Sequence, residues 1–134
     1  MNTVRSLSLV CVFAAAAALV SCASSSGGGS EPLDGRSYKV TLVSPSGDKM
    51  ADDLFFKGGK FESTVCTSAG FAVSPYHAQA VEGGESFTVE CDSPSMGHNE
   101  WHGTAKGDQI EGTVVRTPKG GAPINSTFSG SLVK

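Results

Sequence analysis

The chain has 134 residues, a formal net charge of −3 and only 17% charged residues. A chain of this length corresponds to one domain. The slightly acidic balance argues against a nucleic-acid-binding protein, which would carry a basic patch or stripe. Hydrophobic residues make up 39% of the sequence and Leu, Ile, Val and Phe occur throughout, so the composition is not that of a disordered chain.

The beginning of the chain has the features of an export signal. Arg5 supplies a positive charge, and the residues from Leu7 to Val20 are apolar except for Ser8. This stretch is shorter than the roughly 20 apolar residues that span a bilayer, and it matches the hydrophobic region of a secretory signal peptide. It ends in Leu19-Val20-Ser21-Cys22, which resembles the lipobox of bacterial lipoproteins.

The resemblance to lipoproteins implies that residues 1–21 are removed and that Cys22 becomes the first residue. Its sulfur would carry diacylglycerol and its amine an acyl chain such as palmitate. Two or more chains hold a protein stably at a membrane, so we expect a cell-envelope protein with membrane lipid as a partner. The residue after the cysteine is Ala23 and not the Asp of inner-membrane retention, which favours the outer membrane. The alternative is ordinary cleavage after Ser21-Cys22-Ala23 and release of a soluble protein.

Residues 22–35 follow as a Ser/Gly-rich segment with little to bury, for which we expect a flexible tether. Residues 36–134 are predicted to form the folded domain. There, apolar and polar residues alternate with a period of two between Gly- and Pro-containing turns, and no segment of ten residues has helical periodicity. Eight strands are predicted, with apolar positions that span Tyr38–Leu42, Leu54–Phe56, Phe61–Val65, Tyr76–Ala80, Phe87–Cys91, Trp101–Ala105, Ile110–Val114 and Ile124–Leu132.

The short connections require sequential antiparallel neighbours, because a parallel pair needs a crossover of a dozen or more residues. Eight antiparallel strands can close into an up-and-down β-barrel, which removes exposed edges; a two-sheet sandwich is the alternative. Gly103, Gly112 and Gly130 fall on the expected inner face, where they would relieve crowding. In strand number and length, residues 36–133 resemble small barrels of the avidin and lipocalin type, in layout and without a shared motif.

Two of the four cysteines remain in the mature domain, because Cys11 leaves with the signal and Cys22 is lipidated. Disulfides persist in exported proteins, so we expect Cys66 and Cys91 to form one. By alternation, Cys66 falls with Thr64 on the outer face of the third strand, whereas Cys91 falls on an inner face. The bridge therefore requires that Cys66 lie past the end of its strand or in a bulge.

Other candidate chemistry is sparse. His98, Glu100 and His102 would form a row on the outside of the sixth strand that could hold a divalent metal weakly, but solvated side chains are the favoured interpretation. Trp101 is expected in the core. No cysteine or serine has a local base beside it, and no phosphate-binding loop or pair of catalytic carboxylates is present. We therefore assign no catalytic residue, metal or cofactor.

The leading functional hypothesis is a non-enzymatic lipoprotein whose barrel is a binding or interaction module. A carrier of a small apolar molecule is one alternative, because an eight-stranded barrel can hold one small ligand. Aromatic side chains could instead fill the interior, and an open apolar cavity of roughly 300 Å³ or more would favour the carrier. An inhibitor of secreted proteases, acting through an exposed N-terminal segment, is a further alternative. An enzyme would require polar groups that converge in a cleft.

Overall fold

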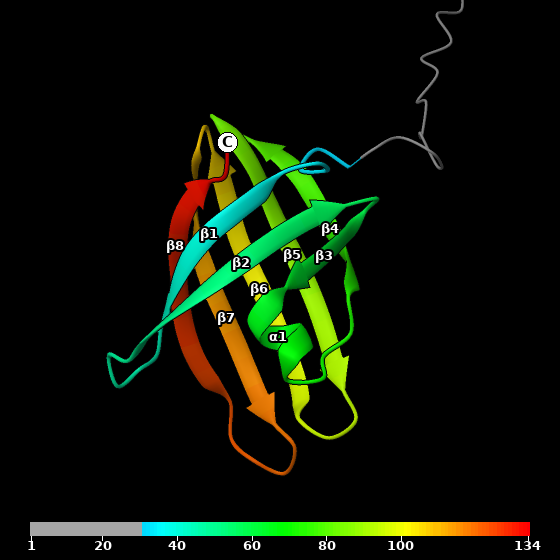
Figure 1. The fold of residues 1–134 in the computed structure, drawn as a ribbon, viewed down its shortest axis with the longest axis vertical. Helices are drawn as coiled ribbons and strands as arrows, with labels where there is room; N and C mark the ends of the chain where they lie inside the picture. Colours follow the sequence, from blue (N-terminus) through cyan, green and yellow to red (C-terminus); the bar gives the residue numbers. More distant parts are fainter. Residues whose placement is uncertain (1–30) are drawn as a thin grey trace, which may run out of the picture.

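The structure is a computed structural model that describes residues 31–134. It is a closed barrel of eight antiparallel strands in sequence order, with β1 paired to both β2 and β8 (Figure 1). The up-and-down barrel predicted from the alternation is confirmed, and the sandwich is not formed. The elements are β1 Ser37–Val43, β2 Lys49–Lys57, β3 Lys60–Ser63, α1 Thr64–Ser68, β4 Ser74–Val81, β5 Gly84–Ser93, β6 Gly97–Lys106, β7 Gln109–Pro118 and β8 Ile124–Leu132.

Aromatic side chains fill the middle of the barrel. The ring of Phe56 lies with its centroid 5.0 Å from that of Tyr76 and 5.1 Å from that of Phe87, in edge-to-face geometry. Trp101 lies between Phe61 and Phe128, at 5.1 and 5.2 Å. These separations fall within the 4.5–7 Å range of favourable aromatic pairs. All six residues are at most 2% exposed, so the predicted inner faces of these strands are confirmed.

Two glycines make room for this aromatic core. Gly103 and Gly112 face each other across β6 and β7. A Cβ atom on Gly103 would lie 2.5 Å from the ring of Phe87, and one on Gly112 would collide with the carbonyl oxygen of His102. Glycine at these positions lets the strands and the rings approach more closely than any other residue would permit.

The segment before β1 lies at the upper end of the barrel in Figure 1. Leu33, which the sequence analysis placed in the tether, has no exposed surface. The carboxylate of Asp34 accepts hydrogen bonds from the backbone N–H of Gly59 and the hydroxyl of Tyr76, both at 2.9 Å. These contacts fix the segment across the β2–β3 turn and one strand of the wall.

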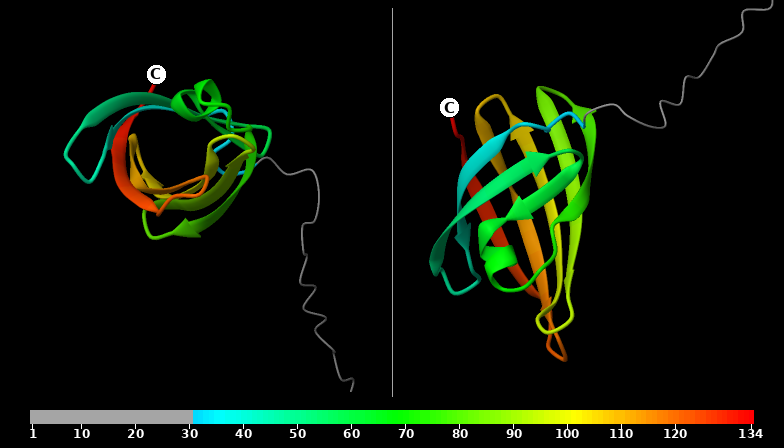
Figure 2. Two further views of the ribbon diagram at one scale, coloured as in Figure 1. Left: turned by 90° about the horizontal axis from the view of Figure 1, so that it is seen from below. Right: turned by 45° about the vertical axis from the view of Figure 1, so that its right-hand side comes forward.

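The lower end differs because β3 is short. The sequence predicted a strand through Val65, but β3 ends at Ser63 and the five-residue helix α1 follows. In Figure 2 the barrel is seen as a closed ring, with α1 at its rim. The helix and the segment after it lead to β4, so β3 and β4 pair at two positions, Lys60 with Pro75 and Phe61 with Ser74.

Candidate ligand-binding pocket

A cavity of about 340 Å³ lies at the lower end of the barrel, between α1, the β1–β2 hairpin and the lower ends of β6, β7 and β8. Most of its surface is apolar. The apolar lining residues are Leu42, Met50, Val65, Cys66, Ala69, Phe71, Trp101, Val114 and Ile124. The polar lining residues are Ser44, Asp48, Lys49, Asn99, Arg116 and Ser126.

The strand register arranges the lining in two layers. Trp101 pairs with Val114, and Val114 pairs with Ser126, which places these three residues side by side across β6, β7 and β8. The second layer lies two residues further along each strand toward the lower end. In this layer Asn99 pairs with Arg116, and Arg116 pairs with Ile124. The deeper layer is therefore apolar apart from one small hydroxyl, and the shallower layer is mixed.

One wall of the cavity is α1, which is held by a buried carboxylate. Asp52 in β2 is 4% exposed. It accepts hydrogen bonds from the hydroxyl of Ser63, from the hydroxyl of Thr64 at 2.9 Å and from the backbone N–H of Val65 at 3.0 Å. Ser63 is also the N-cap, since its hydroxyl oxygen accepts a hydrogen bond from the backbone N–H of Cys66 at 3.1 Å. These bonds satisfy donors that a helix start leaves open.

Cys66 points inward from α1, lines the cavity and makes a polar contact with a residue of the opposite wall. Its sulfur accepts a hydrogen bond from Asn99 Nδ2 at 3.2 Å. Burial raises the pKa of the Cys66 thiol, partly offset by the contacts with Ser63 and Asn99 and by the positive charge of Arg116. The thiol is therefore protonated at neutral pH, and a protonated thiol is a poor nucleophile.

Two polar atoms of the lining residues lack a protein partner. Asn99 is 4% exposed and Trp101 is 1% exposed. Within residues 31–134, neither Asn99 Oδ1 nor Trp101 Nε1 makes a hydrogen bond. Buried polar groups in native proteins are nearly always paired, and an unpaired one costs about 1–3 kcal/mol. Two further unpaired atoms, Tyr38 Oη and Glu85 Oε2, lie outside the cavity lining, so unpaired buried atoms are not confined to the cavity.

The predicted disulfide between Cys66 and Cys91 is not formed, because both residues are free thiols. Cys66 does lie past the end of its strand, as the bridge required, because β3 ends at Ser63. Its side chain is buried and not on the outer face that alternation alone gave. Each sulfur has its own polar neighbour, Asn99 for Cys66 and Ser74 for Cys91. Burial raises the pKa of Cys91 to about 11.

The predicted histidine row lies on β6 and forms separate pairs. His98 Nδ1 lies 2.7 Å from Asp92 Oδ1, and His102 Nε2 lies 2.6 Å from Glu100 Oε1. All four side chains are substantially exposed. No group of three or more His, Cys, Asp or Glu side chains suited to a metal ion occurs in residues 31–134.

The lipobox residues and Cys22 lie outside the described residues, as does the N-terminal segment that a protease inhibitor would require. Among the described residues, no helix combines the length and the apolar character needed to cross a membrane. Comparisons with protein-family models, with curated proteins and with solved structures found no match for this chain.

The alternation in the sequence predicts Trp101 and the inward faces of the strands, but it does not predict the pocket. The lining of the pocket combines residues from α1, from a turn and from strand ends, which no local pattern connects. The role of Asp52 as the anchor of α1 was not predicted either. A carboxylate on the apolar face of an alternating strand, two residues before Leu54 and four before Phe56, was the available signal for a buried anchor.

Proposed function

We propose that this protein is a lipid-anchored binding protein of the bacterial cell envelope. Its barrel would hold a small, mainly apolar molecule at its lower end. The observation that supports binding is the cavity of about 340 Å³ between α1 and the lower strand ends. Its volume lies at the lower end of the roughly 300–1,000 Å³ found for small-molecule pockets. Of the functions that the sequence left open, the carrier fits this cavity best.

The lining favours binding over catalysis. Small-molecule sites are typically apolar with a few polar groups that orient the ligand, and here a mainly apolar lining carries the side chains of Asn99 and Arg116 in its shallower layer. The nucleophile candidate of the cavity is Cys66, whose raised pKa keeps it protonated and whose side-chain contacts are a serine and an amide. A base that could activate it is not among those contacts.

Binding can be tested with N-phenyl-1-naphthylamine, a neutral apolar fluorophore that accepts excitation energy from tryptophan. The protein would be the exported full chain with Cys22→Ser, which cannot be acylated. Trp101 is the sole tryptophan of the chain and lines the cavity. We therefore expect saturable probe fluorescence upon tryptophan excitation, with quenching of Trp101.

A matched pair of variants on β8 locates the probe. Ser126 lines the cavity, whereas the next residue, Thr127, is exposed on the other face of the strand. Ser126→Phe should fill the cavity and weaken probe binding at least about tenfold, equivalent to about 1.4 kcal/mol. Thr127→Phe should leave binding unchanged. Equal binding by both variants, or no saturable binding by the parent, would refute the proposed carrier.

The anchor is supported by Leu19-Val20-Ser21-Cys22 at the end of an apolar segment, and it is tested separately. Mass spectrometry of the protein extracted from membranes should find a chain that begins with an acylated Cys22. Cys22→Ser should move the protein from the membrane to the soluble fraction. A mature chain without acyl groups, or membrane retention of the Cys22→Ser variant, would refute the anchor without bearing on the pocket.

A further inference from the structure

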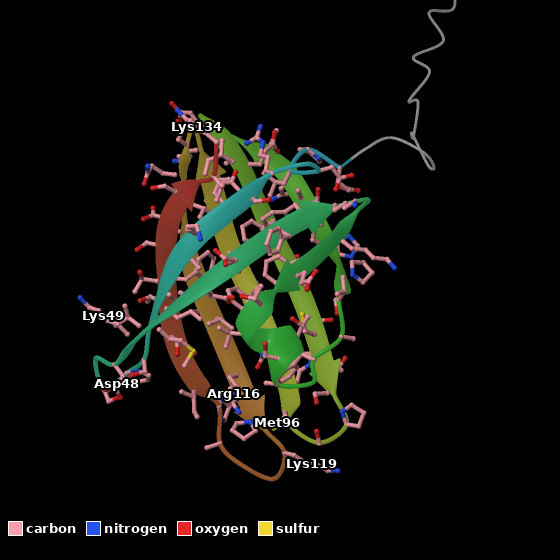
Figure 3. The ribbon with its side chains drawn as sticks, in the orientation of Figure 1. Asp48, Lys49, Met96, Arg116, Lys119 and Lys134 are labelled. Carbon is pink, nitrogen blue, oxygen red and sulfur yellow. The ribbon has the colours of Figure 1, made fainter. Side chains whose placement is uncertain are left out.

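The mouth of the cavity carries an unpaired cation. Arg116, at the lower end of β7, lines the cavity and is labelled near the lower end of the barrel in Figure 3. Within residues 31–134, Arg116 makes neither a salt bridge nor a side-chain hydrogen bond. A guanidinium group offers five N–H donors in a planar fork that matches a carboxylate or similar oxyanion.

The other charged groups of the lining do not neutralise Arg116. Lys49 adds a second positive charge, and Asp48 contributes a negative one. The carboxylate of Asp48 accepts a hydrogen bond from the hydroxyl of Ser46 at 2.6 Å, within the β1–β2 turn. The lining therefore has two cations and one anion, and the further carboxylate behind α1, that of Asp52, accepts hydrogen bonds from Ser63, Thr64 and Val65.

The position of Arg116 relative to the apolar layer gives the cavity an apolar inner end and a charged outer end. Trp101, Val114 and Ser126 form the deeper layer, and Arg116 follows Val114 by two residues on β7, toward the mouth. A ligand in this cavity therefore meets apolar side chains at one end and a positive charge at the other.

We infer that the pocket binds a small amphiphile with a single anionic headgroup, such as a medium-chain carboxylate. Its apolar body would lie against Trp101 and Val114, and its headgroup would pair with Arg116. This inference rests on the proposed carrier function and adds the charge of the ligand. A neutral molecule held by the apolar layer alone is the rival, and it predicts no dependence on Arg116.

Decanoate and 1-decanol separate these two cases, because they share an alkyl chain and differ in the charge of the headgroup. Each is used to displace N-phenyl-1-naphthylamine from the Cys22→Ser chain and from the same chain with Arg116→Gln, Arg116→Lys or Lys119→Gln. Lys119 is a cation at the same end of the barrel, with its Nζ atom 3.0 Å from the carbonyl oxygen of Pro94, and it does not line the cavity.

We expect Arg116→Gln to weaken decanoate about fivefold, the upper value for a solvent-accessible charge pair, and decanol less than twofold. Arg116→Lys should restore most of the loss, and Lys119→Gln should change neither ligand. If Arg116→Gln weakens both ligands equally or neither, or if Lys119→Gln has the same effect as Arg116→Gln, the anionic headgroup is refuted. Retained probe binding in that case would leave the carrier function standing, whereas a parent chain that binds no probe would refute both.

Discussion

The buried carboxylate of Asp52 is the contact on which the shape of the pocket depends, and Asp52→Ala tests it. The substitution removes the acceptor of two hydroxyl donors and of the Val65 N–H. Hydrogen bonds to charged groups contribute about 1.5–3 kcal/mol each, and the two hydroxyls can turn to other acceptors. We therefore expect a loss of about 2–4 kcal/mol, a large part of the roughly 5–15 kcal/mol that stabilises a domain.

The loss can be measured by urea unfolding with Trp101 fluorescence as the signal. The control is Asp53→Ala on the opposite face of β2, which removes an exposed ion pair between Asp53 and Lys39 at 3.2 Å and should cost at most about 1 kcal/mol. Because α1 is one wall of the cavity, Asp52→Ala should also weaken probe binding under conditions where the chain is folded. Equal costs for the two substitutions would refute the role of Asp52 as the anchor of α1.

Three further predictions concern the barrel itself. Gly112→Ala should destabilise the fold by about 1–3 kcal/mol through overpacking. The control is Gly121→Ala in an exposed loop, where the added Cβ would lie 3.2 Å from the Pro118 side chain and should change stability by less than about 0.5 kcal/mol. Urea unfolding of the two variants compares these free energies. Burial raises the pKa of the Cys91 thiol from 9.0 to about 11. The contribution of the protonated thiol to the free energy of unfolding is therefore full below about pH 9 and is lost toward pH 11. Cys91→Ala should flatten the dependence of stability on pH in this range. The hydrogen bond from the Gly59 N–H lowers the pKa of Asp34. The contribution of the Asp34 carboxylate to the stability of the fold is therefore full above its ordinary pKa and is lost as the pH falls toward the lowered value. Asp34→Asn should make the stability less sensitive to acid.

The barrel could be predicted from the sequence because its signals are local. Alternation assigns each residue to a face, and tight turns join neighbouring strands, as in the hairpin that pairs Trp101 with Val114 across Gly107-Asp108. A closed barrel then follows without information on contacts between distant residues, since sequential antiparallel pairing leaves only β1 and β8 to find each other.

The helix α1 could not be predicted in this way. The helix spans Thr64–Ser68, and three of its five residues are β-branched: Thr64, Val65 and Thr67. Such residues have a low propensity for helices and a high propensity for strands. What stabilises it is a set of hydrogen bonds to Asp52, 11 to 13 positions earlier in the sequence. The same misassignment reversed the predicted direction of Cys66, because alternation was continued past the end of the strand.

The pocket follows from where large side chains end along the barrel. An eight-stranded barrel has an interior just wide enough for its side chains, and the buried rings of Phe56, Phe87 and Trp101 fill its middle. In the layer of Trp101 the neighbouring strands carry the smaller Val114 and Ser126, and α1 forms another wall of the cavity. Selection for stability alone would favour a larger residue at Ser126. A small residue there, at the same end as the unpaired Arg116, links the open volume and the positive charge to one ligand.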